Sequence, residues 1–208
     1  MDAILMCGGE GRRLAASLDH ERSDDRIEKP LFEVSGRPMV DRVLTALDAS
    51  AVDAVHAAVS PATPARREHL DGRTNLIETP GEGYVDDLAG AVDEVGTPAL
   101  TVAADLPLLG GDLVDAALEA HDTGPVTVCV PAALKRRLGV GVDTAFDPGE
   151  VDADVVGVAR PAPSELAPTG LNIASDDDPT QTMSLSYDAR LAVNVNRNRD
   201  AEIAEALL

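Results

Sequence analysis

The chain has 208 residues, of which 44% are hydrophobic and only 2% aromatic, and its formal net charge is −20. This length and apolar content predict one globular domain, residues 1–208, with a core of aliphatic side chains. The acidic charge excludes nucleic acid as a partner, and no apolar run reaches the roughly twenty residues of a membrane helix.

The first half of the chain predicts strands and helices in alternation. An apolar strand over residues 3–6 leads into a glycine-rich loop, and Ser17–Glu28 lacks apolar periodicity, so we expect a mobile loop there. Helical spacing predicts a helix after Pro38, and the same patterns predict strands at 54–59, 76–78 and 99–104 and a helix over 84–95. Such alternation predicts an α/β fold with a mostly parallel sheet, helices on both faces, and ligands beyond the carboxyl ends of the strands.

The second half of the chain is less regular. It predicts a helix near 112–121, a strand over 126–131, a final strand over Arg190–Val195 and a closing amphipathic helix over 199–207. Between them, Gly139–Pro168 is rich in proline, glycine and aspartate, and its pattern assigns no pairing.

The loop after the first strand carries the first candidate site. Its nucleotide-binding candidates are Cys7, Gly8, Gly9 and Gly11. Without Cβ atoms, glycines let a loop lie close against a triphosphate with its amides aimed at the oxygens. The spacing matches neither the P-loop nor the dinucleotide-binding fingerprint. For the glycines alone, a turn that only reverses the chain is the alternative.

Two basic residues strengthen the interpretation of this loop as a phosphate site. Arg13 follows the glycines, and Lys29 stands directly before Pro30 in a chain whose only other lysine is Lys135. Solvation does not account for so rare a residue in a loop on the ligand side of the sheet. We therefore predict that Arg13 and Lys29 are catalytic residues that neutralise phosphate charge.

The glycine-rich loop, followed by Lys29-Pro30-Leu31, resembles the signature of nucleotidyltransferases that have a Rossmann-like, glycosyltransferase-A-type fold. A closer resemblance is to the guanylyltransferases of archaeal cobalamin assembly, and four short segments carry it, at residues 60–64, 81–88, 168–172 and 193–196. This resemblance implies GTP and adenosylcobinamide phosphate as substrates and Mg²⁺ as cofactor. The chain departs from the family pattern at Cys7, where relatives commonly have alanine, and in the longer stretch between Leu14 and Lys29.

Asp105 directly follows the apolar strand expected at 99–104. Mg²⁺ takes few carboxylates and completes its octahedron with waters and phosphate oxygens, so one aspartate there suits it. The resemblance implies that Asp105 is a metal ligand and that Asn196 is a second metal or phosphate contact. The alternatives are a capping role for Asp105 and, for Asn194 and Asn196, hydrogen bonds to turn backbone.

The guanine base of GTP is expected to contact Gly81, Glu82 and Gly83, which form a loop between a strand and a helix. A carboxylate such as that of Glu82 accepts hydrogen bonds from N1 and the exocyclic amine of guanine, although loop backbone could read the base as well. Ser60, with Thr63 nearby, is a candidate base or ribose contact, and an ordinary Ser/Pro turn is the alternative.

The remaining polar segments divide into one candidate site and several surface features. Thr169, Gly170 and Asn172 precede a segment that we expect to form a strand, and they resemble the part of the family's site that holds the acceptor. The four histidines show no ligand spacing, and Asp176–Asp178 is interpreted as solvated acidic surface.

The predicted reaction is attack by the acceptor's phosphate oxygen on the α-phosphorus of GTP, with pyrophosphate as leaving group. The nucleophile is already anionic and needs no general base, so positioning and charge neutralisation supply the catalysis. The alternatives are molybdenum-cofactor guanylyltransferase, phospholactate guanylyltransferase, sugar-1-phosphate nucleotidyltransferase, and a GTP-binding regulatory module without turnover.

Cysteine usage and charge also predict the environment of the protein. Cys7 and Cys129 are too few and too distant for a disulfide framework or a zinc site, so we expect reduced thiols in a cytoplasm. The acidic composition is typical of proteins that stay solvated in concentrated salt, which favours a halophilic source.

Overall fold

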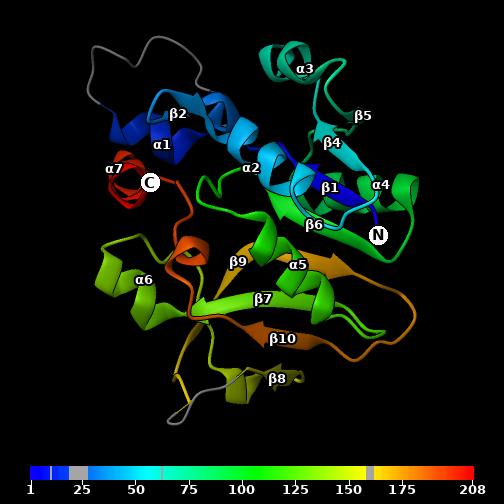
Figure 1. The fold of residues 1–208 in the computed structure, drawn as a ribbon, viewed down its shortest axis with the longest axis vertical. Helices are drawn as coiled ribbons and strands as arrows, with labels where there is room; N and C mark the ends of the chain where they lie inside the picture. Colours follow the sequence, from blue (N-terminus) through cyan, green and yellow to red (C-terminus); the bar gives the residue numbers. More distant parts are fainter. Residues whose placement is uncertain (10, 19–27, 62, 158–161) are drawn as a thin grey trace.

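The computed structural model of the protein describes residues 1–9, 11–18, 28–61, 63–157 and 162–208 (Figure 1). Most of the loop expected over Ser17–Glu28 therefore lies outside the described residues. The strands are β1 (Ala3–Met6), β2 (Glu33–Val34), β3 (Arg37–Pro38), β4 (Val55–Val59), β5 (Asn75–Glu78), β6 (Ala99–Ala103), β7 (Val126–Pro131), β8 (Asp154–Val156), β9 (Leu166–Ala174) and β10 (Thr182–Leu185). The helices are α1 (Arg12–Ser17), α2 (Met39–Asp48), α3 (Pro64–Leu70), α4 (Tyr84–Val95), α5 (Gly111–Glu119), α6 (Ala132–Leu138) and α7 (Asn198–Leu207), with 3-10 turns η2 (Lys29–Leu31), η3 (Pro148–Glu150) and η4 (Ala189–Ala192).

The central sheet has the strand order β5-β4-β1-β6-β9-β7-β10-β8 (Figure 1). Every neighbouring pair is parallel except the two pairs of β9, which runs antiparallel to β6 and β7. The start of β9 therefore lies at the same edge of the sheet as the carboxyl ends of β1 and β6. This edge is where ligands bind in open α/β sheets.

Strand β1 shows why helices cover both faces of the sheet. Its side chains alternate, so Leu5 packs on one face with Val43 of α2 and Val114 of α5, while Met6 packs on the other face with Ala91 of α4. Full burial of one such leucine stabilises the fold by about 2 kcal/mol. The predicted fold class, a mostly parallel α/β sheet with helices on both faces, is confirmed.

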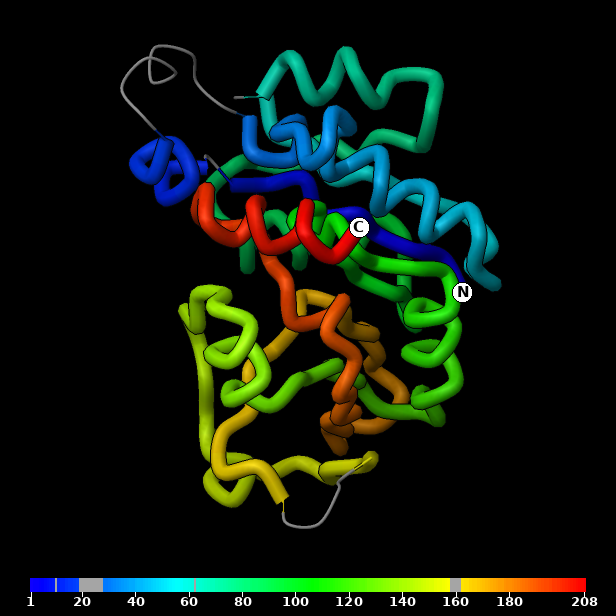
Figure 2. The backbone as a smooth tube through the Cα atoms, turned by 60° about the vertical axis from the view of Figure 1, so that its left-hand side comes forward, coloured from blue at the N-terminus to red at the C-terminus, as the bar shows by residue number. Residues whose placement is uncertain are grey.

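The C-terminal helix α7 returns to the N-terminal part of the chain, beside β2 (Figure 2). Ala201 and Ala204 of α7 are buried in a cluster with Leu14, Val34 and Met39. This packing places the segment before α7, which carries Asn194 and Asn196, next to the loop that follows β1. In the part of the chain that the structure describes, no helix combines the length and apolar character that a membrane span requires.

Two expectations about the second half of the chain are wrong. Arg190–Val195 is not a strand: Ala189–Ala192 forms the turn η4, and Val195 makes a single backbone bond of 3.0 Å to the oxygen of Asp105. Its apolar pattern reflects burial against the core rather than membership of a ladder. The strand beside β7 is β10, which is too short for periodicity to identify it.

The acceptor candidates Thr169, Gly170 and Asn172 lie inside β9, and the expectation that they precede a strand is wrong. The pairing of β9 with β7 is irregular here, because Thr127 pairs with Asn172 whereas Cys129 pairs with Pro168. Such bulges bend a strand and redirect its side chains, and they are common beside active sites.

Candidate active site

A cavity of about 430 Å³ opens where β1 and β6 end and β9 begins. Two groups of residues face each other across it. The glycine-loop wall comprises Gly8, Arg13 and Lys29 together with Gly9 and Gly11 of an adjoining hollow of about 380 Å³. The bulge wall comprises Lys135, Thr169, Gly170, Asn172 and Asn194, and Asp105 lies between the two walls.

Lys29 lies at the centre of the glycine-loop wall. Its Nζ donates to Oδ2 of Asp105 at 2.5 Å and to Oδ1 of Asn196 at 2.7 Å. The lysine side chain is 14% exposed and that of Asp105 is 18% exposed, so water screens this pair only in part. The fold thus brings together Lys29, Asp105 and Asn196, which are far apart in the sequence.

A buried ion pair holds the segment that carries Lys29. The carboxylate of Glu28 accepts hydrogen bonds from the backbone nitrogens of Ala65 and Arg66 and from Nε of Arg66, at 3.1, 2.8 and 3.0 Å. Arg66 is only 1% exposed and also donates to the carbonyl oxygen of Gly9 at 3.4 Å. Arg66 therefore connects the glycine loop to the residue before Lys29, a role that no sequence pattern indicated.

The glycine loop combines open backbone with one buried side chain. Gly9 has a φ of 103°, and a Cβ built on it would meet no atom within 4 Å, so this part of the loop faces open space. Cys7 does not line the cavity, because it is fully buried and its amide donates to the carbonyl oxygen of Ala58 at 3.2 Å. Burial raises the pKa of its thiol to about 12, although the charge of Arg66 opposes this shift.

Arg13 is held in position by Asp143, which the sequence analysis did not identify. The carboxylate of Asp143 pairs with Nη1 of Arg13 at 2.6 Å and with Nη2 of Arg197 at 2.7 Å. Burial raises the pKa of Asp143, but the hydrogen bonds and charges of the two arginines outweigh that effect and hold it below its usual value. Asp143 thus orients Arg13 toward the cavity and offsets part of its charge.

Lys135 of α6 is the second lysine in the cavity, and the sequence analysis did not assign it a role. Its Nζ donates to the carbonyl oxygen of Ala192 at 2.9 Å and to Oδ1 of Asn194 at 2.8 Å. Burial lowers the pKa of Lys135, although the charges of Asp105, Asp200 and Asp143 oppose the shift. The rarity of lysine, which drew attention to Lys29, applied equally to Lys135 and could have identified it.

Asn194 joins the two walls through Asp105. Its Nδ2 donates to Oδ1 of Asp105 at 3.2 Å and to the carbonyl oxygen of Thr169 at 2.6 Å. A continuous series of hydrogen bonds therefore runs from Lys29 through Asp105 and Asn194 to Lys135. Asn194 was expected at most to satisfy turn backbone, whereas its amide here fixes the orientation of Asp105.

The bulge in β9 shapes the wall opposite the glycine loop. The side chain of Thr169 is buried and donates to the carbonyl oxygen of Val128 at 2.9 Å, so Thr169 offers backbone rather than hydroxyl to the cavity. Gly170 has a φ of 88°, and a Cβ there would come within 3.0 Å of the Cβ of Ala103. Glycine is thus required for the close approach of β9 to β6.

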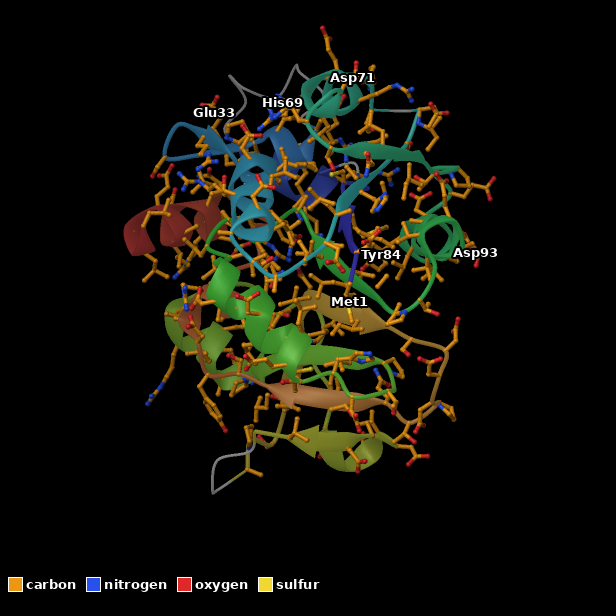
Figure 3. All side chains as sticks on the ribbon, turned by 45° about the vertical axis from the view of Figure 1, so that its right-hand side comes forward. Met1, Glu33, His69, Asp71, Tyr84 and Asp93 are labelled. Carbon is orange, nitrogen blue, oxygen red and sulfur yellow. The ribbon has the colours of Figure 1, made fainter. Side chains whose placement is uncertain are left out.

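The candidate base-binding residues gather beside the glycine loop rather than in the cavity. A Cβ built on Gly81 would lie 2.6 Å from Oγ of Ser60, so these two residues are in contact. The buried carboxylate of Asp87 accepts from the amide of Gly81 at 2.7 Å and lies 3.6 Å from the Cβ position of Gly8. Glu82 and Gly83 are exposed. The next residue, Tyr84, which is labelled in Figure 3, lines the cavity.

The arrangement of oxygens between the walls fits a magnesium site. Oδ2 of Asp105 and Oδ1 of Asn196 converge on one point, where the cationic Nζ of Lys29 now lies. Within the described ranges no cluster of three or more His, Cys, Asp or Glu side chains could hold a metal by itself. One carboxylate plus an amide oxygen matches the preference of Mg²⁺ for few protein ligands completed by substrate phosphates.

Comparison with known proteins gives three informative similarities. Residues 3–144 match the family of MobA-like NTP transferase domains. The chain is 27% identical over 221 residues to adenosylcobinamide-phosphate guanylyltransferase of Methanocaldococcus jannaschii, covering 100% of this chain and 97% of that protein. It is 33% identical over 128 residues to 3-deoxy-manno-octulosonate cytidylyltransferase of Azorhizobium caulinodans, covering 55% of this chain and 48% of that one.

The fold also resembles a solved structure. A hypothetical transferase from Thermus thermophilus superimposes with a TM-score of 0.57 at 22% identity, covering 84% of this chain. The chain spans 64% of the length of that structure. This likeness supports the α/β architecture alone.

Proposed function

Because this chain belongs to the family of MobA-like NTP transferase domains, and is a nucleotidyltransferase, we propose that it transfers GMP from GTP to adenosylcobinamide phosphate and releases pyrophosphate. The choice of donor and acceptor follows the guanylyltransferase of Methanocaldococcus jannaschii, to which the chain is similar over its whole length.

One observation carries the proposal: a lysine, a carboxylate and an amide oxygen converge beside an open glycine loop. Nζ of Lys29 donates to both Asp105 and Asn196, and all three residues line the same cavity as Gly8. Glycine backbone and a lysine suit the oxygens of a triphosphate, and the oxygen ligands suit the cation that accompanies it.

In the proposed reaction an acceptor phosphate oxygen forms a bond to the α-phosphorus, and the bond from that phosphorus to the pyrophosphate oxygen breaks. Lys29, Arg13 and the amides of Gly8, Gly9 and Gly11 hold the triphosphate and offset the charge that grows on the pyrophosphate. No general base is required, because the attacking oxygen is anionic.

Asp105 and Asn196 are the residues that would hold Mg²⁺, which when bound supplies charge compensation to the phosphate oxygens. In the nucleotide complex, Lys29 would give up its contact with Asp105 and bind a phosphate oxygen of the nucleotide. Asn194 keeps Asp105 oriented through this exchange, because it bonds the other carboxylate oxygen.

Ser60, Gly81, Glu82 and Gly83 are proposed to contact guanine and its ribose, since Gly81 contacts Ser60 and donates to Asp87, whose carboxylate lies near Gly8. The backbone of Thr169 and Gly170 and the side chain of Asn172 are proposed to contact the acceptor. This arrangement puts the donor and the acceptor on opposite sides of Asp105.

The decisive experiment incubates the purified protein with Mg²⁺, one nucleoside triphosphate and one acceptor, and measures pyrophosphate. GTP with adenosylcobinamide phosphate should release pyrophosphate and give a product heavier by one GMP. ATP, UTP and CTP should support much slower release, and chelation of Mg²⁺ should abolish it.

Acceptor controls separate the proposal from its alternatives. Phospholactate, molybdopterin and a sugar 1-phosphate should yield no pyrophosphate above the rate without acceptor. If the protein turned over one of these acceptors faster than adenosylcobinamide phosphate, it would be a nucleotidyltransferase of different acceptor specificity. GTP affinity without turnover on any acceptor would instead indicate a regulatory nucleotide-binding module.

A further inference from the structure

Lys135 is a buried cation that pairs with no carboxylate among the described residues. Its side chain is only 4% exposed, and both of its hydrogen-bond acceptors are neutral oxygens, those of Ala192 and Asn194. The other cations of the cavity differ, since Lys29 is paired with Asp105 and Arg13 with Asp143. The carboxylates of Asp105, Asp200 and Asp143 act on this charge, but none of them forms an ion pair with Lys135, so an anion brought by a ligand would offset more of the cost of burial.

The position of Lys135 separates it from the glycine loop. The loop follows β1, whereas Lys135 lies in α6, directly after β7, and the sheet order places β6 and β9 between those two strands. Three strand spacings correspond to about 14 Å. A triphosphate bound along the glycine loop, with its α-phosphorus near Asp105, leaves Lys135 on the far side, where the attacking group must approach in line.

We propose that Lys135 binds the phosphate of the acceptor and that, with Asn194, it forms the anion subsite from which the nucleophilic oxygen attacks. This assignment deepens the proposed function and rests on it. The subsite takes a phosphomonoester dianion, and Asn194 links its position to that of Asp105 through the hydrogen bond between them.

The charge balance of the reaction gives the reason for a second lysine. The triphosphate of GTP and the phosphomonoester dianion of the acceptor must approach each other inside a protein whose formal charge is −20, so each needs a cation at its reacting phosphate. The chain has two lysines, Lys29 and Lys135, and both line this cavity, on opposite sides of Asp105. Lys29 lies beside the glycine loop, which leaves Lys135 to the acceptor.

The test compares Lys135→Met with Arg136→Ala in steady-state assays with GTP and adenosylcobinamide phosphate. Methionine keeps much of the length of lysine without its charge. Arg136 is the neighbouring residue on α6, is exposed and pairs with Glu165, so it controls for the loss of a cation on the same helix. Loss of a charge-assisted hydrogen bond should raise the KM of the acceptor about 10- to 100-fold in Lys135→Met. The KM of GTP should change less than about twofold, and Arg136→Ala should match the unaltered enzyme.

The outcomes separate this inference from the function on which it rests. If the unaltered enzyme turns over while Lys135→Met keeps its acceptor KM, or raises both KM values equally, the assignment of Lys135 is wrong. If the unaltered enzyme releases no pyrophosphate with any phosphorylated acceptor, the proposed function fails and this subsite fails with it.

A measurement on the unaltered protein covers the case in which Lys135→Met does not fold. Selective ¹³C-lysine labelling gives two Cε signals, because the chain has two lysines, and Lys29→Arg assigns them. Adenosylcobinamide phosphate should shift the signal of Lys135, and GTP should shift that of Lys29. A Lys135 signal that responds to GTP and not to the acceptor would overturn the proposal.

Discussion

The two walls of the cavity hold their lysines in different ways. On the glycine-loop wall, Lys29 is paired with the carboxylate of Asp105, whereas on the bulge wall the acceptors of Lys135 among the described residues are the neutral oxygens of Ala192 and Asn194. A paired cation must first exchange its partner to meet a phosphate, while an unpaired cation presents its charge at once. This difference matches the proposed division of roles, in which one wall binds the nucleotide and the metal and the other binds a second anion.

The exterior of the protein contrasts with both walls. Exposed acidic side chains such as Glu33, Asp71 and Asp93 lie on the outside of the structure, where Figure 3 shows them. The two lysines are withdrawn into the cavity instead. In a chain of formal charge −20, this distribution concentrates positive potential where phosphates are proposed to bind.

Lys29→Ala breaks the glycine-loop wall and should have the largest effect on activity. We expect kcat for pyrophosphate release to fall about 10²- to 10³-fold, because a preorganised cation at the developing charge is lost. Lys29→Arg keeps the charge and should retain more activity than Lys29→Ala. Turnover that is unaffected in Lys29→Ala, with unfolding curves matching the unaltered protein, would remove Lys29 from the mechanism.

Glu28→Gln tests how firmly that wall is anchored. It leaves the guanidinium of Arg66 buried without its counter-ion, which should lower the free energy of unfolding in urea by about 3 kcal/mol. Glu78→Gln is the matched control, because Glu78 pairs with Arg67 on the exposed face of α3 and should cost below about 1 kcal/mol. Equal costs for the two variants would show that the Glu28–Arg66 pair does not anchor Lys29.

Asp143→Asn tests how the ion pairs of Asp143, which hold Arg13 on the glycine-loop wall, contribute to stability at different pH values. The two arginines hold the folded-state pKa of Asp143 below its usual value of 3.8, so their contribution to stability is fully present above that pH. It is lost as the pH falls from 3.8 through the lower folded-state value. Because Arg13 and Arg197 are partly exposed, we expect the variant to cost below about 1 kcal/mol at pH 7.

The corresponding measurement is the difference in unfolding free energy between the unaltered protein and Asp143→Asn at pH values from 7 to 3. The difference should shrink only in the acidic part of this range. A constant difference across the range would mean that Asp143 does not titrate through its ion pairs.

The smallest effect is expected at Cys7. Because burial raises the pKa of its thiol to about 12, native protein at pH 8 should react with a thiol reagent far more slowly than unfolded protein. Labelling followed by mass spectrometry measures this rate directly. Rapid labelling of Cys7 that GTP prevents would instead place its thiol in the nucleotide site.

The local features of this protein could be predicted from its sequence. Hydrophobic patterns predicted the strands β1, β6 and β7 and the helix α4, because such patterns depend on residues close together in the chain. The glycine loop, Lys29 and Asp105 were also identified, since residue types with unusual backbone or charge stand out even in a single sequence.

Only the tertiary structure decided which residues meet in the cavity. The antiparallel insertion of β9 between β6 and β7 places Gly170 against Ala103, and the bulge there depends on the pairing with β7. The hydrogen bonds of Asn194 reach 59 residues back to Lys135 and 89 residues back to Asp105. Contacts of that span depend on how the whole sheet closes, and local pattern carries no information about them. The sequence therefore determined the chemistry of the glycine-loop wall, while the folding of distant segments onto one edge of the sheet built the wall that faces it.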